Sequence, residues 1–415
     1  MQTDRAKRCS STLRPRVLWV SESPRLHTGH GRVTDEISKR LAAGGKYEVG
    51  VLGWGAEPYL DGECTMFAPG PQPWLSARVN RVIEDFGPDV VVTSGPLLAL
   101  GVMEEVSLRP FVSWVGYATF EASPVPVALR AVLRRMDRAV VPSAWCRSAL
   151  VDERSPHESR KGSPVRVIPC AVDSQDFHPR PDRDDLRAAY GLAQKFVVGC
   201  VARNHFRKQI PVLLKAFARF AKRHREALLY LHMDPDGPVW RLPELVKQHR
   251  LERRVAFTRG LVGPVGTTTQ TLNAIYNLFD VMVLPTMGEA FGLPILEAMA
   301  AGVPVIGTAC SAVNELVEGR GELIAVRDWL TMNWDNAEYA LPDADGLVEK
   351  LELLYADQEL RLEYGRRGRA FAETMTWDRA AVAWKRLLDG VVSRSPRGYR
   401  AASAPWVSAV RRAAQ

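Results

Sequence analysis

Short apolar runs alternate along the chain with longer segments whose apolar residues recur at helical spacing. A short apolar run bounded by turn residues is typical of a buried strand, and a 3.6-residue period is typical of a surface helix. Strands that alternate with helices form parallel sheets covered on both faces, with ligand sites at the carboxyl ends of the strands. The pattern predicts strands at Val17–Val20, Tyr47–Leu52, Val90–Thr93, Phe111–Val115, Ala139–Val141, Val165–Ile168, Phe196–Ala202, Ala227–His232, Val255–Thr258, Asp280–Leu284, Val303–Gly307 and Glu322–Val326.

One stretch of the second half, Asp280–Gly307, combines a strand, a tight loop and a helix. The loop Thr286–Leu293 leads into a predicted helix at Pro294–Ala301, with proline at its first position and Gly302 at its end. The free N–H groups at the start of such a helix attract anions. We therefore expect an anion above this strand end, and a diphosphate fits best.

Two carboxylates mark this stretch. Glu289 lies in the loop, whereas Glu297 lies about one turn into the helix, so the two should address different parts of one ligand. Glu297 is suited to accept hydrogen bonds from a ribose, and Glu289 to reach a sugar or its developing charge. The simpler interpretation is that both carboxylates only complement the positive end of the helix.

The two glutamates, the FGLP run between them and the AMAAGVPV run of Ala298–Val305 closely resemble the E-x7-E signature of the retaining glycosyltransferases of family four. The resemblance covers roughly Val17–Val391 and is strongest in the second half. It implies the GT-B fold, an α/β fold with two Rossmann-like domains facing a central cleft and a C-terminal helix that crosses back to the first domain. It also implies donor-binding roles for Glu297, Phe291, Gly292, Leu293 and Gly260, and a catalytic role for Glu289.

Two cations follow the predicted strand Phe196–Ala202. Arg203 and Lys208 would neutralise a diphosphate, because arginine grips phosphate oxygens with parallel hydrogen bonds and lysine acts as a point charge. Their spacing resembles that of the family's arginine and lysine that hold the donor phosphates, which implies catalytic roles for both. The alternative is a solvated basic loop, and nothing in the spacing requires His205 or Arg207.

The first predicted strand is followed by Gly29, His30 and Gly31. Two such glycines alone usually mark a tight turn, but their place resembles the family's glycine-rich loop, which faces the donor diphosphate and the acceptor. The family usually has a histidine after a later strand, where this chain reads FVSWVGYATFEASPVP. Tyr117 and Glu121 therefore join Gly29, His30 and Gly31 as the candidates on the cleft and acceptor side. For His30 the simpler interpretation is a solvated turn residue. Either another polar group makes the contact of the family's histidine, or the donor sugar and the reaction differ.

A chain of 415 residues is too long for one ordinary core, and we expect two domains. The expected organisation is a basic tail at 1–16, an acceptor domain at 17–180 completed by 378–391, a donor domain at 181–377, and a second basic tail at 392–415. The polar stretch Pro179–Arg187 is the expected linker. An acidic and aromatic segment, Arg327–Asp343, carries Trp329, Trp334 and Tyr339, which either stack on a sugar or a partner protein or, as we favour, pack on the domain surface.

The formal net charge of +8 belongs to the two ends of the chain. Residues 1–16 carry a net charge of +4 and residues 391–415 of +5, which leaves −1 for the body. Basic tails favour peripheral contact with an anionic membrane, although they are also common as solvated ends. A near-neutral body without an interleaved basic and aromatic motif argues against a nucleic-acid-binding protein.

The six cysteines are scattered without a C-x-x-C pair, and no apolar run approaches the roughly 20 residues that span a membrane. We therefore expect a cytoplasmic protein. No metal site is expected either, because Arg203 and Lys208 would replace the charge of a metal. The resemblance implies a retaining, metal-independent hexosyltransferase that uses a nucleotide-diphosphate sugar, UDP- or GDP-linked, as its donor substrate and needs no cofactor. Its acceptor is a glycan, lipid, small molecule or protein. The alternatives are a non-catalytic nucleotide-sugar-binding protein and a GT-B sugar-nucleotide epimerase or hydrolase.

Overall fold

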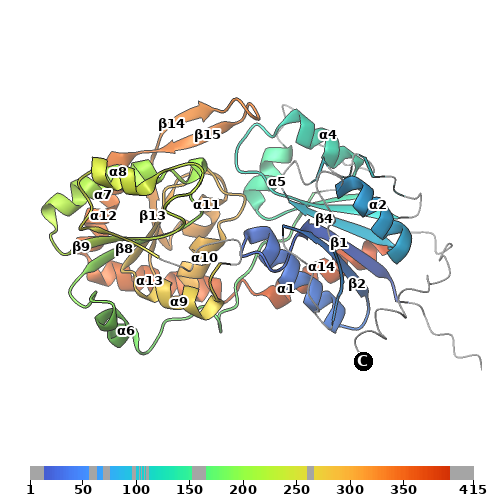
Figure 1. The fold of residues 1–415 in the computed structure, drawn as a ribbon, viewed down its shortest axis with the longest axis horizontal. Coiled ribbons are helices and arrows are strands. Elements are labelled where there is room, and N and C mark those ends of the chain that lie inside the picture. Colours follow the sequence, from blue (N-terminus) through green and yellow to red (C-terminus); the bar gives the residue numbers. More distant parts are fainter. Residues whose placement is uncertain are drawn as a thin grey trace, which may run out of the picture.

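The computed structural model describes residues 14–55, 63–68, 75–95, 100–101, 103, 105–106, 108, 112–151, 165–258 and 266–392. Within these ranges the chain forms two domains that lie side by side, each built around one sheet (Figure 1). Both basic tails, apart from 14–16 and 392, and Gly260 lie outside the described residues. None of the helices in the described part of the chain is long and apolar enough to cross a membrane.

The first domain contains a parallel sheet in the order β3-β2-β1-β4-β5-β6-β7. Its strands are nearly continuous apolar runs, as expected where helices cover both faces of a sheet. The strands are β1 (Arg16–Glu22), β2 (Glu48–Trp54), β3 (Thr65–Phe67), β4 (Val90–Gly95), β5 (Ser113–Ala118), β6 (Arg138–Val141) and β7 (Arg166–Val167). The described helices are α1 (Gly29–Ala43), α2 (Leu75–Phe86), α4 (Val127–Arg135) and α5 (Ala144–Val151).

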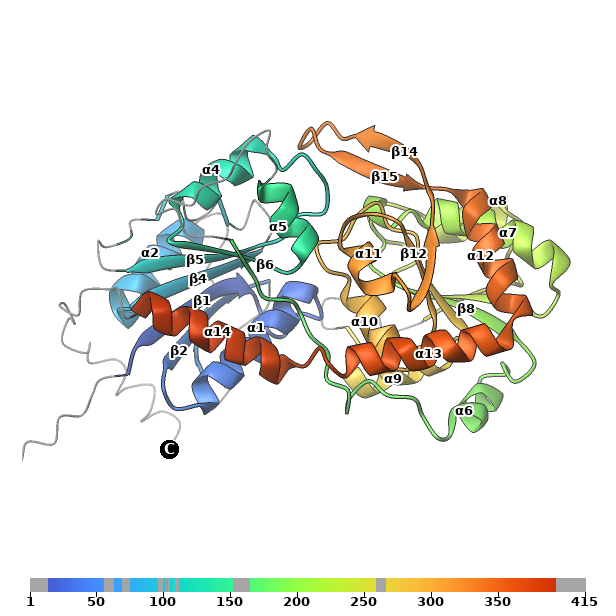
Figure 2. The same ribbon diagram turned by 180° about the vertical axis from the view of Figure 1, so that it is seen from behind.

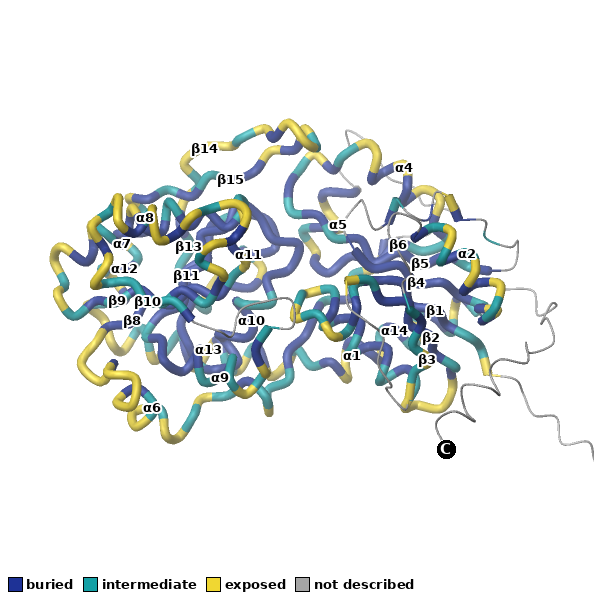
Figure 3. The backbone as a smooth tube through the Cα atoms, viewed as in Figure 1, coloured by how far each residue is buried: buried dark blue, intermediate teal, exposed yellow. Residues whose placement is uncertain are grey.

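Alternate residues of β1 show how the two faces of this sheet are covered. Val17 and Trp19 pack in the cluster that contains α1 residues, whereas Leu18 and Val20 pack in the cluster that contains α2 and α4 residues. Successive strand side chains point to opposite faces, so one apolar strand contributes to two cores. Figure 3 shows the sheet buried between its helices.

The second domain contains a parallel sheet in the order β10-β9-β8-β11-β12-β13. Its strands are β8 (Phe196–Val201), β9 (Ala227–His232), β10 (Val255–Phe257), β11 (Val281–Leu284), β12 (Val305–Thr308) and β13 (Gly321–Ile324). Its helices are α6 (Arg183–Ala189), the 3-10 turn η2 (Phe206–Lys208), α7 (Ile210–Arg223), α8 (Leu242–Gln248), α9 (Thr269–Asn277), α10 (Leu293–Ala300), α11 (Ser311–Val317), α12 (Ala344–Ala356) and α13 (Gln358–Ala372).

The last helix, α14 (Trp377–Val392), returns to the first domain, where it lies beside α1 (Figure 2). Trp384 packs edge-on against Trp19, with ring centroids 5.0 Å apart, and against Tyr117 at 5.6 Å. Arg40 of α1 binds Asp378 at 2.8 Å. The predicted α/β class, with two Rossmann-like domains and a returning helix, is confirmed.

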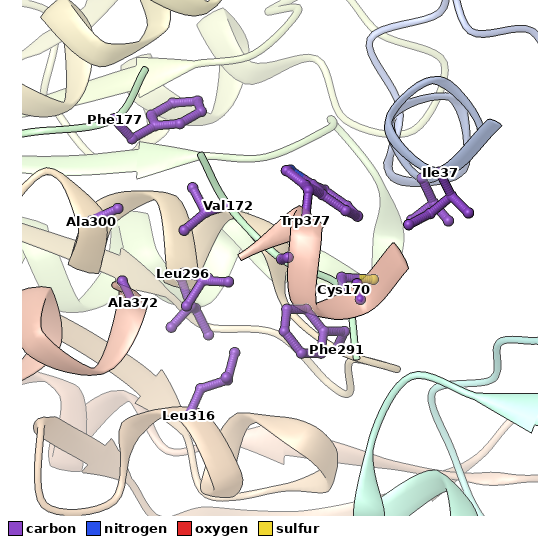
Figure 4. Packing of buried hydrophobic residues seen from close by; sticks show 14 of the residues in the cluster. Ile37, Cys170, Val172, Phe177, Phe291, Leu296, Ala300, Leu316, Ala372 and Trp377 are labelled. Carbon is purple, nitrogen blue, oxygen red and sulfur yellow. The ribbon is translucent and has the colours of Figure 1, made fainter. Parts of the chain in front are cut away.

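One hydrophobic cluster continues from the first domain into the second. Figure 4 shows its middle part, where Phe291 and Leu296 of the second domain lie near Cys170 and Trp377. Since all of these side chains are at most 7 % exposed, the two domains share a core on this side of the molecule.

Two segments differ from the expectation. The expected linker Pro179–Arg187 includes most of α6, which is fixed to the second domain because the Arg187 guanidinium lies 3.1 Å from the carboxylate of Asp280. The segment Arg327–Asp343 contains an antiparallel hairpin of β14 (Val326–Thr331) and β15 (Glu338–Pro342). Tyr339 is buried there, as expected for surface packing, whereas Trp334 is 59 % exposed.

Candidate active site

The strand order of the second sheet explains why the predicted donor residues meet. β8 and β11 are neighbours in the sheet. The chain continues from β8 to β9 and from β11 to β12, which lie in opposite directions along the sheet. Ligands of open parallel sheets bind at such a point, beyond the carboxyl ends of the two strands. The loop after β8 carries Arg203 and Lys208, and the loop after β11 carries Glu289. Chain topology therefore brings these groups to one edge.

Glu289 is held by two cations. The ammonium of Lys208 contacts its Oε1 atom, and Nη1 of Arg207 lies 2.9 Å from the same oxygen. The amide of Glu289 donates a hydrogen bond of 2.8 Å to the Ser311 hydroxyl. Burial alone would raise the pKa of Glu289, but Arg207 and Lys208 outweigh it and lower this pKa to about 2. Glu289 is therefore a fixed carboxylate at neutral pH.

Arg203 is the exposed cation of this loop. Its side chain has no hydrogen bond or ion pair among the residues that the structure describes. Its charge nevertheless contributes to lowering the pKa of His30 in the first domain. Arg203 thus lies near the first domain with its guanidinium donors unused.

The turn into α10 leaves amides open. Gly292 has φ of 109°, a conformation that favours glycine, and Pro294 follows in the first turn. Within the described structure, the amides of Gly292 and Leu293 donate to no protein group. Phe291 contributes only its backbone here, because its side chain is 7 % exposed in the shared core. The loop therefore presents N–H donors where the sequence predicts a diphosphate.

Glu297 has surroundings of its own. The hydroxyl of Tyr276 on α9 donates a hydrogen bond of 2.8 Å to its Oε2 atom. Burial raises the pKa of Glu297, whereas the positive charge of Arg32 on α1 and the Tyr276 hydrogen bond lower it. The two glutamates therefore do occupy different environments, one near η2 and one between α9 and α1.

The first domain contributes the start of α1. Gly29 faces Leu293 of the second domain, since a Cβ atom at Gly29 would lie 3.6 Å from its Cδ1 atom. His30 bridges two strand ends: Nδ1 lies 3.3 Å from the Ser94 hydroxyl and Nε2 lies 3.2 Å from the Thr119 hydroxyl. Burial lowers the pKa of His30 by more than the negative charges of Glu22 and Glu121 raise it. The imidazole is therefore neutral at pH 7.

Two expectations for the first domain need revision. Gly31 meets no ligand surface, because a Cβ atom there would overlap the backbone carbonyl of Leu26, so the turn itself requires the glycine. Tyr117 lies in the core, not at the domain boundary: it is 2 % exposed and donates a hydrogen bond of 3.1 Å to the Ile168 carbonyl. We therefore remove Tyr117 from the candidate site.

Glu121 does lie at the boundary between the domains. Its carboxylate is 3.3 Å from Nη2 of Arg207. Gly288 packs directly on the Glu121 backbone carbonyl, and a Cβ atom at that glycine would overlap it. Glu121, Arg207 and Glu289 thus form a chain of charges that connects the two domains.

Sequence reasoning passed over four of these contacts. The spacing of the loop after β8 does not require Arg207, while Arg32, Ser94 and Tyr276 carry no motif that marks them. The position of Arg32, one residue after the GHG turn, was the one available signal. Among the described residues no group of three or more His, Cys, Asp or Glu side chains is placed to hold a metal ion.

Residues 195–357 match the family model described as "Glycosyl transferases group 1". The second domain is similar to group 1 glycosyltransferases. Curated relatives include the lipopolysaccharide core biosynthesis mannosyltransferase LpsB of Rhizobium meliloti, 31 % identical over 55 % of this chain and 65 % of the relative. A GDP-mannose-dependent alpha-(1-6)-phosphatidylinositol monomannoside mannosyltransferase of Mycolicibacterium smegmatis is 28 % identical over 60 % of this chain and 66 % of the relative. Among the first curated relatives that match, the match spans between about half and two thirds of the relative's own length.

Solved structures resemble nearly the whole chain. Sucrose-phosphate synthase from Thermosynechococcus elongatus superposes with a TM-score of 0.73 at 21 % identity, covering 92 % of this chain and all of that one. HepE from Anabaena, in complex with UDP and glucose, gives a TM-score of 0.70 at 19 % identity, covering 91 % of this chain and all of that one. At this identity the likeness shows the fold alone, and that fold is GT-B.

Proposed function

We propose that the protein is a glycosyltransferase that moves a hexose from a nucleotide-diphosphate sugar to an acceptor hydroxyl, with retention at the anomeric carbon. The observation that carries this proposal is the ionised Glu289 carboxylate, held by Lys208 beside the open amides of Gly292 and Leu293. Donors for a diphosphate and an acceptor for sugar hydroxyls thus lie next to each other. The family match of the same residues supports this assignment.

The donor diphosphate would bind between the α10 turn and the cations that follow β8. Arg203 has unused guanidinium donors there, and Lys208 needs only to turn from Glu289 to reach a phosphate. Preorganised cations and amides stabilise the negative charge that develops on a leaving group, and this effect is often the largest in catalysis. Arg203 and Lys208 supply the positive charge, so the proposal requires no metal or other cofactor. Glu297 would bind the ribose through its Oε1 atom.

The sugar would lie against Glu289, which accepts hydrogen bonds from its hydroxyls and stabilises its cationic character. The bond from the anomeric carbon to the diphosphate breaks, and its electron pair leaves with the diphosphate. The acceptor oxygen bonds to the same face of that carbon, and its proton passes to a departing phosphate oxygen. In this scheme neutral His30, held by Ser94 and Thr119, makes the contact that the family makes with a histidine after a later strand.

The donor nucleotide is UDP or GDP in this proposal. GDP is included because relatives of the second domain are named for GDP-mannose, and UDP because a solved neighbour of the same fold holds it. The acceptor side is formed by the first domain, around Gly29 and Glu121, and the acceptor class stays open among glycans, lipids, small molecules and proteins. Peripheral contact with an anionic membrane through the basic tails also remains a proposal.

The experiment begins with the thermal stability of the purified protein in UDP, GDP, ADP and TDP without added metal. A ligand at about 100 times its dissociation constant adds roughly 2.7 kcal/mol to the free energy of unfolding. We expect one nucleotide to stabilise the protein, and its sugars are then incubated with an acceptor panel. A glycosylated product supports the transferase. Bound nucleotide sugar without product favours the non-catalytic protein, and nucleotide release independent of acceptor favours an epimerase or hydrolase. No stabilisation by any nucleotide would contradict the proposal.

A further inference from the structure

Arg207 is the side chain that connects the two domains at the candidate site. Its Nη1 atom lies 2.9 Å from Glu289 and 3.3 Å from the Thr286 hydroxyl, and its Nη2 atom lies 3.3 Å from Glu121. The side chain is 17 % exposed. The proposed transfer assigns phosphates to Arg203 and Lys208, but it gives Arg207 no part.

The backbone fixes this arginine between its partners. The amide of Met287 donates a hydrogen bond of 2.8 Å to the Arg207 carbonyl, which ties the β11–α10 loop to η2. On the other side, Gly288 packs on the Glu121 carbonyl. The planar guanidinium has five donors in a rigid fork and can serve two carboxylates at once, whereas an ammonium acts as one point charge.

Lys208 carries a single positive charge, so a second anion beside it weakens its hold on Glu289. In the structure it contacts Glu289, but the proposed reaction needs it at the diphosphate. If Lys208 turns away, Glu289 loses one of its two cations while remaining buried. A buried carboxylate without a cation is strongly destabilised and takes up a proton. Arg207 is placed to prevent this.

We propose that Arg207 is a positioning residue that keeps Glu289 ionised and aimed at the donor sugar when Lys208 turns to the diphosphate, and that its contact with Glu121 ties this carboxylate to the first domain. The inference rests on the proposed glycosyl transfer and deepens it. Arg207 acts through Glu289 and touches no substrate.

The charged and titratable groups around this arrangement come from every element that packs on it. Lys208 and Arg207 face Glu289 from η2. The Cys310 thiol faces it from the loop before α11, and this thiol is neutral because burial raises its pKa to about 12. Glu121 and Tyr339 face Arg207 from the other side. Burial lowers the pKa of the neighbouring His205, so this histidine is uncharged at neutral pH. Arg207 and Lys208 are thus the cations that set the charge of Glu289.

The test compares three variants with the wild type. Arg207→Gln removes the cation, Arg207→Lys keeps the charge without the fork, and Glu121→Gln removes only the contact with the first domain. Arg223→Gln is the matched control, because this arginine binds Glu352 at the surface, at the end of α7 that lies away from η2. For each protein, kcat and KM for the donor are measured from pH 4 to 9, together with the dissociation constant of the nucleoside diphosphate.

We expect Arg207→Gln to lower kcat by about 100-fold, the scale of loss when a reacting geometry is misplaced. Its nucleotide affinity should stay within about threefold of the wild type, because Arg203 and Lys208 remain. The acid limb of its kcat profile should move to higher pH, since Glu289 now gains a proton more easily and activity falls as it does. Arg207→Lys should restore the wild-type acid limb but only part of kcat. Glu121→Gln should lower kcat with an unchanged acid limb.

Unchanged kcat and pH profile in Arg207→Gln, with an active wild type, would overturn the role of Arg207 and leave the proposed transferase intact. A loss in Arg207→Gln with no shift of the acid limb would also overturn it, because that pattern indicates a merely structural arginine. An inactive wild type that binds no nucleotide would instead refute the proposed function. If Arg207→Gln does not fold, Arg207→Lys and Glu121→Gln still test the proposal. It requires both variants to keep the acid limb of the wild type and to have a lower kcat than the wild type.

Discussion

The Tyr276 hydroxyl donates a hydrogen bond of 2.8 Å to Oε2 of Glu297, so the carboxylate assigned to the ribose is already oriented by the protein. Both side chains are buried, with Tyr276 fully inaccessible. The remaining oxygen, Oε1, has no partner among the described residues. The second domain thus provides half of the hydrogen bonding of this carboxylate and leaves the other half for a ligand.

Removing this hydroxyl should weaken nucleotide binding. We expect Tyr276→Phe to raise the dissociation constant of the nucleoside diphosphate by about tenfold, because a hydrogen bond to a charged group is worth roughly 1.5–3 kcal/mol and its loss also raises the pKa of Glu297. Isothermal titration calorimetry measures this change. Tyr190→Phe is the control, since Tyr190 is 64 % exposed. An unchanged dissociation constant in Tyr276→Phe would show that Glu297 does not need its orienting partner.

Glu315 joins the domains at a second place. From α11 its carboxylate accepts hydrogen bonds from the amides of Ala144, at 3.1 Å, and Trp145 at the start of α5. We expect Glu315→Ala to lower the free energy of unfolding by about 1 kcal/mol, the usual loss when a helix N-terminus loses its acceptor. It should also speed hydrogen exchange at these two amides. Glu349→Ala is the control, at an exposed position of α12, and should change neither the free energy of unfolding nor the exchange at these amides. Unchanged exchange at Ala144 and Trp145 would contradict the contact.

The low pKa of Glu289 makes a prediction about stability and pH. A carboxyl whose pKa is about 2 when folded and about 4.3 when unfolded stabilises the folded state above pH 4.3, and this contribution is lost as the pH falls towards 2. The full contribution is on the order of 3 kcal/mol. Urea unfolding of Glu289→Gln should therefore show its largest loss at pH 7 and a shrinking loss below about pH 4. A loss that is constant between pH 7 and pH 3 would mean that Glu289 is not held as an anion.

Much of the fold was predictable because burial on both faces gives parallel strands an unmistakable composition. Four predicted ranges, Val17–Val20, Val90–Thr93, Phe196–Ala202 and Asp280–Leu284, correspond to the central strands β1, β4, β8 and β11. Edge and surface elements were harder. β3 is a three-residue edge strand, and β14 is largely exposed, so neither has an apolar run that distinguishes it from a loop.

The site was predictable where local sequence fixes the geometry. The sequence of residues 286–300 contains a tight loop, a proline and a helical pattern. This was enough to predict that Glu289 lies in the loop, that Glu297 lies on the helix, and that their surroundings differ. The contacts across the domain boundary were not accessible, because they depend on how two sheets face each other. Tyr117 illustrates this limit: it lies on β5, next to the expected acceptor side, yet its side chain points to the face that Trp384 covers. Arg207 shows the reverse: no spacing marks this residue, yet Glu121 of the first domain and Glu289 of the second domain both contact it.

The most direct test of the account compares how tightly the protein binds a nucleoside diphosphate and the matching monophosphate, UDP with UMP or GDP with GMP, without added metal. If Arg203 and Lys208 hold the second phosphate, the wild type binds the diphosphate at least tenfold more tightly, a difference of about 1.4 kcal/mol. That preference should disappear in Arg203→Ala and Lys208→Ala and persist in Arg223→Ala. Equal affinity of the wild type for both nucleotides, or a preference unchanged in the two site variants, would contradict the proposed donor site.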